Sequence, residues 1–551
     1  TYNFRNSATA SNATLSFTNA IVNFNDASGA QAANINLNAS FVYAFSGYLR
    51  DGKISLDNGS LVQIVGASTG GTEFVTVDGG STVLVTYGGS IGSIAGPGTL
   101  NIQNPADVGG NNKSTSFSGT ILAFSNRLTK VGTGIWTLSG ANTITDQTVI
   151  AGGLINFSAL ANFGTGRVVL NGGGVQWAAG NTIDISPRLD PIGSSGGTFD
   201  TNGNNVTLGT GISGGGGITK AGSGTLTLTG VNTYQGGTTI NAGTISVAAN
   251  NNLGSGALAF GGGTLQTMAS FAMLRATTLN SGGTFDVASG TTLTHGGVIG
   301  GTGGLTKTGG GTLVLTAVNT YQGGTTINAG TLELSDSGSI ASSSLVDLAA
   351  AGASFDISPS TINQTIQDLR GVAGSRVRLG DHSLTVGTAN STTFAGIVDA
   401  GPFGLGTGGL IKQGSGTLTL TGANTYTGGT TITGGLINFT TLGNFGTGNV
   451  TLDGGGVQWA AGNTIDISTR LSAIDSNGGT FDTNGNNVTL ATAISGTGGI
   501  TKVGNGTLTL SGINTYGGAT AINGGTLALS GDGSIAASRG ANLAAAGATF
   551  D

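Results

Sequence analysis

The sequence predicts an all-β fold, a parallel β-helix (solenoid) in which short strands stack coil upon coil. Three observations predict it. Apolar and polar residues alternate over runs of five or six residues, clusters of Gly and Asn interrupt these runs, and one block of sequence recurs along the chain. Period-2 alternation is typical of a half-buried strand, and Gly and Asn favour the tight turns that join strands.

The composition indicates a chain of strands and turns with little charge. Glycine provides 107 of 551 residues, and charged residues are 8%, against roughly a quarter in ordinary soluble domains. The net charge of −6 and the absence of any basic run argue against a nucleic-acid partner. Cysteine is absent, so no disulfide forms, and no run of apolar residues is long enough to predict a membrane-spanning helix.

The recurring block reads LTK-x-G-x-G-TLTLTG-x-NTY-x-GGTTI-NAGTL. Its lysine recurs at intervals of 90, 87, 105 and 90 residues, at Lys130, Lys220, Lys307, Lys412 and Lys502. The first copy departs from the others, because Ile144 stands where the later copies have tyrosine. We expect units of about 90 residues, with repeat cores near 128–155, 218–247, 305–334, 410–437 and 500–529.

Within each unit the alternation places one face of every strand in a core. Leu226 and Leu228 of TLTLTG point one way, and the threonines between them point the other. Ile245 follows Leu226 by 19 residues, close to one β-helical coil, so that a unit would contain about four coils. A propeller with two blades per unit is the alternative, but the unequal spacings favour the β-helix, since a closed ring does not tolerate them.

The first 115 residues contain no copy of the block. The stretches SLVQIVGA at 60–67 and STVLVTYGG at 81–89 nevertheless alternate or run as strands. We therefore predict an N-terminal non-repeated β-helical or capping segment at 1–115, followed by the repeat-containing β-helix at 116–551. No convincing helical stretch is found in either segment.

The block closely resembles the passenger-associated transport repeat of type V autotransporters, which are Gram-negative surface proteins. The resemblance is strong at 218–247, 305–334, 410–437 and 500–529, and partial at 128–155. It implies an elongated right-handed parallel β-helix that is exported across the outer membrane through the protein's own C-terminal β-barrel. No barrel sequence is recognised before Asp551, so we expect a passenger without its translocator.

The five repeated lysines are the first candidate binding residues. As a surface array they could bind anionic glycans, but about four coils, roughly 20 Å, would separate successive copies. We interpret each one instead as a solvated lysine that limits lateral pairing of sheets.

No catalytic site is predicted. Ser337 in LSDSGSI resembles the nucleophile motif of serine-protease autotransporters, but the related unit reads LSGDGSI, and His295 and His382 are the chain's two histidines. Asp184 and Asp466 lie between isoleucines and should point outward. Other aspartates follow phenylalanine in a repeated corner, which indicates a structural role: Asp200, Asp286, Asp356, Asp482 and Asp551. We find no clustered, non-repeated acidic set near Lys or Arg, and therefore expect no enzyme.

Neither a metal nor a cofactor is predicted. The glycine-rich stretches lack the aspartate that stacked calcium-binding coils require. Trp177 and Trp459 stand in identical contexts, and we interpret them as packed against a coil rather than as platforms for sugars.

These observations predict an exported, surface-exposed passenger that acts as an adhesin or adhesin stalk. Its partner would be a host-cell surface protein or glycan, or another copy of itself, and its own β-barrel would act in export. The alternative is a structural surface-coat or fibre protein, and a β-helical polysaccharide-degrading enzyme is less favoured. We expect recognition to lie in the first 115 residues or on loops between the copies.

Overall fold

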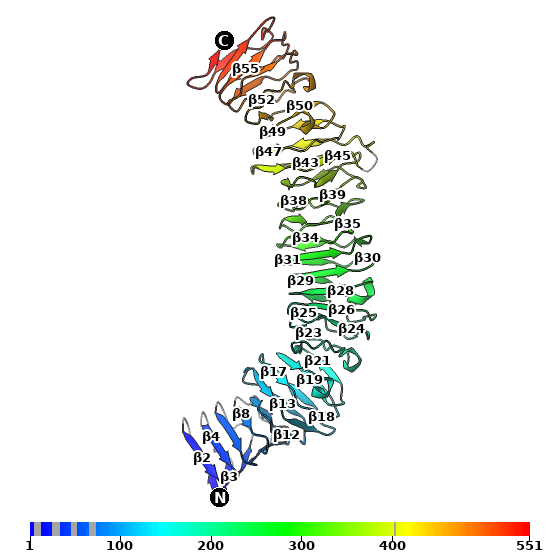
Figure 1. Cartoon of the computed structure of the whole chain (residues 1–551), viewed down its shortest axis with the longest axis vertical. Helices are drawn as coiled ribbons and strands as arrows, with labels where there is room; N and C mark the ends of the chain where they lie inside the picture. The colour runs from blue at the N-terminus through cyan, green and yellow to red at the C-terminus, as the bar shows by residue number, and fades with distance from the viewer. Residues whose placement is uncertain (5–12, 25–33, 46–51, 66–72, 402–403) are drawn as a thin grey trace. The chain divides into compact units, whose positions relative to one another are not determined.

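The computed structural model describes residues 1–4, 13–24, 34–45, 52–65, 73–401 and 404–551 (Figure 1). Parallel strands wind into a β-solenoid of about 26 turns, and the prediction of an all-β parallel β-helix is confirmed. The helical segments among these residues are short 3-10 turns: η1 (Leu160–Phe163), η2 (Ser186–Arg188), η3 (Asn250–Leu253), η4 (Leu442–Phe445) and η5 (Ser468–Arg470). Across the described ranges, no helix has the length and apolar character needed to cross a membrane.

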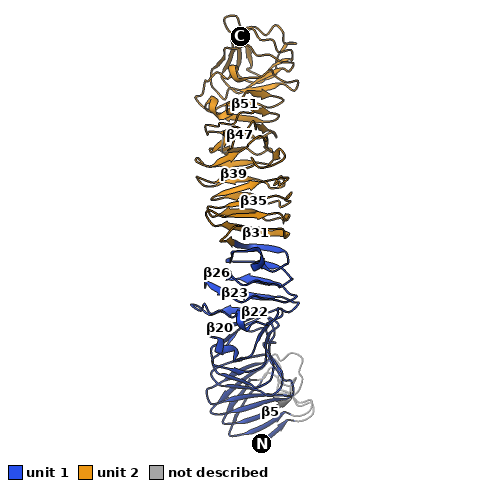
Figure 2. Cartoon of the chain, turned by 90° about the vertical axis from the view of Figure 1, so that its right-hand side faces the viewer, with its two compact units in different colours: residues 1–265 blue, residues 266–551 orange. Residues whose placement is uncertain are grey.

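The solenoid divides into two compact units, Thr1–Leu265 and Gln266–Asp551 (Figure 2). This division differs from the boundary after residue 115 that the repeats suggest, and the role of residues 1–115 as a cap stays a prediction. Each unit has the same internal construction, in which one coil contributes one strand to each of several parallel sheets.

Unit 1 begins with two sheets built from regularly spaced strands. One sheet has eight strands: β1 (Tyr2–Phe4), β3 (Ile21–Phe24), β5 (Phe41–Phe45), β7 (Leu61–Val65), β9 (Thr82–Thr86), β12 (Thr99–Ile102), β15 (Thr120–Ala123) and β18 (Thr143–Ile144). The other has five: β2 (Thr14–Thr18), β4 (Asn34–Asn38), β6 (Lys53–Asp57), β8 (Phe74–Val77) and β11 (Ser93–Ala95). The strands predicted at 60–67 and 81–89 are confirmed as β7 and β9, although residues 66 and 67 lie outside the described residues.

These early coils share a repeated serine that the search for internal sequence repeats does not find. Ser40, Ser60 and Ser81 stack inside successive corners and are at most 3% exposed. Each serine Oγ accepts the backbone N–H of the preceding coil, at 3.1 Å from Ala20, 3.2 Å from Ser40 and 3.0 Å from Ser60. One serine per coil forms this ladder. One shared residue in about 20 is too little similarity for a search for internal repeats to detect.

The repeated block folds into four short strands of two neighbouring coils. In the second copy they are β25 (Ile218–Ala221), β26 (Thr225–Leu228), β27 (Thr238–Ile240) and β28 (Thr244–Val247). Leu226 pairs with Ile245 in the ladder between β26 and β28, which confirms the predicted coil length. Leu226 and Leu228 are buried while the threonines beside them are only half-buried, as the alternation predicts.

Unit 2 contains a seven-stranded sheet whose last five strands lie between the third and fourth repeated lysines along the chain. Its strands are β30 (Phe271–Met273), β32 (Thr292–His295), β35 (Thr312–Leu315), β37 (Thr331–Leu334), β39 (Ser354–Asp356), β42 (Arg376–Arg378) and β45 (Ile397–Asp399). In β39, Phe355 points into the core and is fully buried, so Ser354 and Asp356 share the outer face of this sheet.

Candidate functional site

Each repeated lysine lies in a short strand and points into the core. The five strands are β16 (Leu128–Lys130), β25, β34 (Leu305–Thr308), β46 (Leu410–Lys412) and β54 (Ile500–Val503). Every one of these lysines is at most 1% exposed. Lys220 pairs with Phe199 of the preceding coil and Ile240 of the following coil, so its methylene chain continues a column of apolar side chains.

Three backbone carbonyls hold the Lys220 ammonium group. Its Nζ donates to the carbonyl oxygens of Ala221 at 2.7 Å, Gly222 at 2.6 Å and Ala242 at 3.2 Å. The other four lysines bond the carbonyls at the same three positions, at 2.5–3.3 Å. We call each lysine with its three carbonyls a lysine clasp; because one carbonyl belongs to the next coil, the clasp joins two successive corners.

Glycine is required where the chain passes over the clasp. Gly222 and Gly243 both have positive φ, +67° and +63°, which glycine adopts without strain. A Cβ added at Gly243 would lie 2.5 Å from the Gly222 oxygen and 2.7 Å from Lys220 Nζ. The glycines of the repeat therefore make room for the lysine as well as turning the chain.

The electrostatics of the clasp keep the lysine protonated at neutral pH. Burial lowers the pKa of all five repeated lysines to about 8, and in four of them a nearby aspartate opposes this effect. A protonated amine has three N–H donors, which matches the three carbonyls. The interpretation of these residues as solvated lysines is wrong: their methylene chains pack in the core and their Nζ atoms are fully hydrogen-bonded, so none of the five lies at the surface.

The asparagine of NTY also acts inside the solenoid. Asn232 Oδ1 accepts the N–H of Ile212 in the preceding coil at 2.7 Å, and its Nδ2 donates to the Asn252 carbonyl in the following coil. The other four copies make the same contact to the preceding coil at 2.7–2.9 Å, through Asn142, Asn319, Asn424 and Asn514. One side chain thus links three coils.

The tyrosine of NTY points inward and bonds a threonine. Tyr234 is fully buried, and its hydroxyl lies 2.6 Å from Thr238 Oγ1. In the first copy Ile144 replaces this tyrosine, and the Oγ1 of the corresponding Thr148 is buried without a hydrogen-bond partner. The sequence departure therefore leaves an unpaired hydroxyl in the core.

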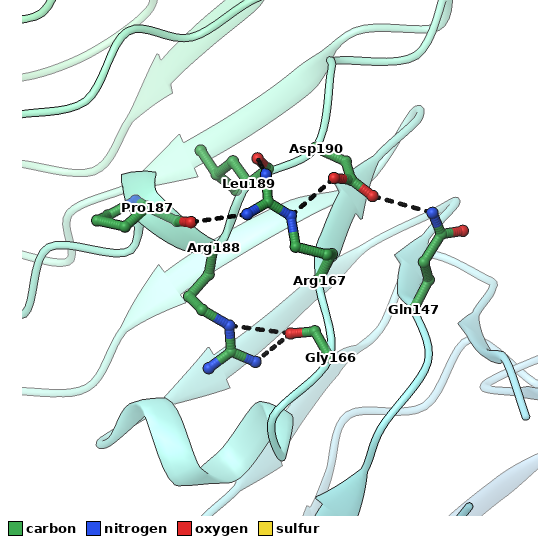
Figure 3. A network of polar contacts seen from close by, with 7 residues as sticks. All are labelled: Gln147, Gly166, Arg167, Pro187, Arg188, Leu189 and Asp190. Atoms are coloured by element: carbon green, nitrogen blue, oxygen red, sulfur yellow. Dashed lines mark hydrogen bonds and ion pairs between the residues drawn. The ribbon is translucent and has the colours of Figure 1, made fainter. Parts of the chain in front are cut away.

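Two arginines tie the coils together near residue 167 (Figure 3). Arg167 Nε lies 2.8 Å from Asp190 Oδ1, and Gln147 Nε2 donates to Asp190 Oδ2 at 2.9 Å. Arg188 Nε donates to the Gly166 carbonyl at 2.9 Å. The Arg188 contact has a counterpart in the later copy, where Arg470 Nε donates to the Gly448 carbonyl at 3.1 Å; Asn449 stands where Arg167 would be. Both arrangements satisfy backbone and carboxylate oxygens across coils, which indicates a structural role.

The tryptophans and the aspartates of TIDIS are structural residues. Trp177 and Trp459 are fully buried, and their Nε1 atoms donate to backbone carbonyls at 2.9 Å, which confirms their packing role. Asp184 and Asp466 are half-buried rather than simply outward. Asp184 Oδ1 accepts the Ser186 N–H at 2.7 Å and its Oδ2 accepts the Gly209 N–H at 2.9 Å, so it joins two coils.

The histidines and Ser337 are not brought together as a catalytic group. His295 is fully buried; its Nδ1 donates to the Gly297 carbonyl at 3.0 Å, which leaves Nε2 to accept from Thr277 Oγ1 at 2.8 Å. Burial lowers the His295 pKa to about 4, so the ring is neutral. Ser337 is exposed on the outside of the solenoid. Within the described residues, no group of three or more His, Asp or Glu side chains is placed to bind a metal ion.

The structure does bring together a charged set that the sequence reading did not find. We call it the acidic–arginine face; its members lie on the outer surface of neighbouring strands β37, β39, β42 and β45: Glu333, Asp356, Arg376, Arg378 and Asp399. The expectation of no non-repeated acidic set near arginine is therefore wrong. Members that are ladder neighbours lie 21–23 residues apart along the chain, so no local motif reveals them, although charged residues are concentrated between 333 and 399.

The comparison with protein families agrees with the repeat boundaries. The family model described as passenger-associated-transport-repeat matches residues 128–155, 218–247, 305–334, 410–437 and 500–529. The chain therefore carries five of these repeats, including the degenerate first copy, and this is consistent with an autotransporter passenger domain. Neither the comparison with curated proteins nor that with solved structures gave a match.

Proposed function

We propose that the chain is an autotransporter passenger displayed on the bacterial surface, where it acts as an adhesin or adhesin stalk and not as an enzyme. The observation that supports this most is the combination of five transport repeats with a clasp in each. In the repeats the lysine, asparagine and tyrosine side chains form hydrogen bonds inside the solenoid. The outer surface of the repeats therefore offers mainly threonine side chains and backbone to a partner.

Export provides a reason why every unit contains the same lysine clasp. In a solenoid each coil contacts mainly its neighbours, so a folded coil can act as the template for the next. Folding outside the cell, coil by coil, would oppose backsliding of the unfolded chain. The clasp suits this process, because it is complete only when the following coil is folded against it and supplies the third carbonyl.

A proline substitution tests the export part of the proposal. Leu226→Pro removes a backbone N–H from β26 and interrupts the ladder, whereas Leu226→Ala keeps the ladder and only removes core atoms. In the full-length protein we expect Leu226→Pro to abolish surface display and Leu226→Ala to retain most of it, as measured by surface labelling of intact cells. Normal display of the proline variant would contradict the templated-export mechanism.

Cell binding tests the adhesin part. The purified chain should bind host cells saturably, and pretreatment of the cells with protease or glycosidase should distinguish a protein receptor from a glycan. Absence of binding to cells, to glycans and to itself would refute the proposal. Ordered filaments or lattices on native cells by electron microscopy would favour a structural coat instead.

A further inference from the structure

The acidic–arginine face carries more acid than base. Arg376 Nη1 lies 2.5 Å from Asp399 Oδ2, and Arg378 Nη1 lies 3.5 Å from Asp356 Oδ2. These two ion pairs leave Glu333, whose carboxylate has no hydrogen bond or ion pair to any described residue. The face therefore has one uncompensated negative charge at Glu333.

The position of Glu333 makes that charge unfavourable. Its side chain is half-buried, and Asp356 is its direct ladder neighbour on the same face. Burial, and then the negative charge of Asp356, raise the pKa of the Glu333 carboxyl. A positive group placed beside Glu333 would relieve both the lost hydration and the repulsion.

An unpaired hydroxyl lies on the same outer face. Ser354 is 6% exposed, and its Oγ is buried without a hydrogen-bond partner. In the ladders Ser354 lies between Thr331, which is on the same strand and face as Glu333, and Arg376. The face thus offers a carboxylate and a hydroxyl oxygen that are both without donors.

The missing partner must donate hydrogen bonds and carry positive charge. A neutral saccharide would supply donors but would leave the Glu333 charge uncompensated. A nearby cation stabilises the ionised form of Glu333 and offsets the repulsion from Asp356, which a neutral donor does not do. An ammonium or guanidinium group satisfies both requirements.

We propose that the acidic–arginine face binds a lysine or arginine side chain of a partner protein, with Glu333 as its counter-ion and Ser354 as a second acceptor. This inference rests on the proposed adhesin function, for which it names the partner as a protein with an exposed basic segment. Arg376 and Arg378 border the site, and their side chains are 45% and 32% exposed. A ligand that reaches the buried Ser354 Oγ displaces neighbouring side chains, and the two arginines limit the positive charge that the site accepts.

Titration of the whole chain with fluorescent tetralysine tests the inference. Glu333→Gln keeps the shape of the side chain but removes its charge, and it should weaken tetralysine binding about tenfold. Asp57→Asn changes the net charge equally at an exposed strand end in the other unit, and it should change the affinity less than about twofold. Arg376→Gln removes a neighbouring cation and frees the Asp399 carboxylate, and it should tighten binding; the double variant Arg376→Gln, Glu333→Gln should lose most of that gain if Glu333 is the counter-ion.

The outcomes separate this inference from the function on which it rests. Equal tetralysine affinity for the parent chain and Glu333→Gln would overturn the cation site, and binding of neutral maltotetraose that is lost in Glu333→Gln would replace it with a glycan site. If Glu333→Gln nevertheless binds host cells normally, the adhesin proposal stands and only this site is refuted. If the parent chain binds tetralysine but no cells, the adhesin proposal fails while the site remains.

Discussion

At the scale of the residue, the β-helical core contains a charged lysine side chain in every repeat. A buried lysine is unfavourable unless its ammonium group is fully hydrogen-bonded. Here corner carbonyls provide three acceptors, and apolar neighbours in the ladder pack the methylene chain, as at Lys220. In return, the lysine provides a donor to each of three corner carbonyls.

The same Thr→Val substitution should change stability in opposite directions in the first and second repeats. Thr148→Val removes a buried hydroxyl that has no partner, so it should stabilise its coil by about 1 kcal/mol. Thr238→Val removes a hydroxyl that bonds Tyr234 and the Leu253 carbonyl, so it should cost about 1–2 kcal/mol. Local hydrogen exchange measures both effects, and equal signs would contradict the assignment of the Tyr–Thr pair.

The pKa values of the lysines predict an alkaline gain in stability. Their pKa of about 8 in the fold lies below the ordinary value of 10.5. Between these values the unfolded chain binds more protons than the folded chain, so stability should rise with pH. Burial raises the pKa of Tyr321, Tyr426 and Tyr516 above 10.0, so stability should fall again above pH 10.

Urea denaturation between pH 7 and 11 measures this dependence. The expected result is a denaturation midpoint that increases from pH 8 and is greatest near pH 10. A midpoint that falls steadily above pH 8 would show that the three carbonyls stabilise the charged form more than burial destabilises it.

At the scale of the element, the corner after each lysine strand has little room for an added side chain. The strands themselves follow from alternation, and Leu226 and Leu228 lie where the pattern places them. The corner could not be predicted in the same way. Its glycines indicate a turn, but only the structure shows that Lys220 Nζ occupies the space beneath Gly243.

Two glycines with similar φ separate backbone strain from crowding. Gly180 has φ +78° with no atom within 4 Å of an added Cβ, whereas Gly243 has φ +63° with three atoms within 2.7 Å. Gly180→Ala should cost about 1 kcal/mol from strain alone. Gly243→Ala should cost about 2 kcal/mol more, because it also forces the clasp apart. Local hydrogen exchange measures the stability that each variant loses. Similar losses in the two variants would contradict the crowding argument.

At the scale of the whole molecule, the sequence was most informative where it repeats. Self-similarity located the five copies, and period-2 alternation predicted the fold class and the coil length. The burial of Lys220 could not be derived in this way, because a lysine beside a turn is ordinarily solvated. A solvated lysine, however, would not need glycine at fixed positions in its own corner and in the next, and that constant spacing was the available signal.

The acidic–arginine face shows the other limit. The sequence places Asp356 among the repeated Phe-Asp corners, yet Asp356 pairs with Arg378 on a sheet face. Its neighbours are determined by ladder register, and register depends on corner lengths that vary in the longest unit. Contacts of this kind follow from the folded coil rather than from any stretch of sequence.

The central claim is that the five repeated lysines are internal clasps and not a surface array. The most direct test is brief acetylation of the native chain with acetic anhydride at pH 8, followed by peptide mass spectrometry. Lys53 and Lys113 are exposed and should be modified rapidly, whereas Lys130, Lys220, Lys307, Lys412 and Lys502 should remain protected until the chain is unfolded in urea. Modification of these five in the native chain, at the rate of Lys53, would contradict the account.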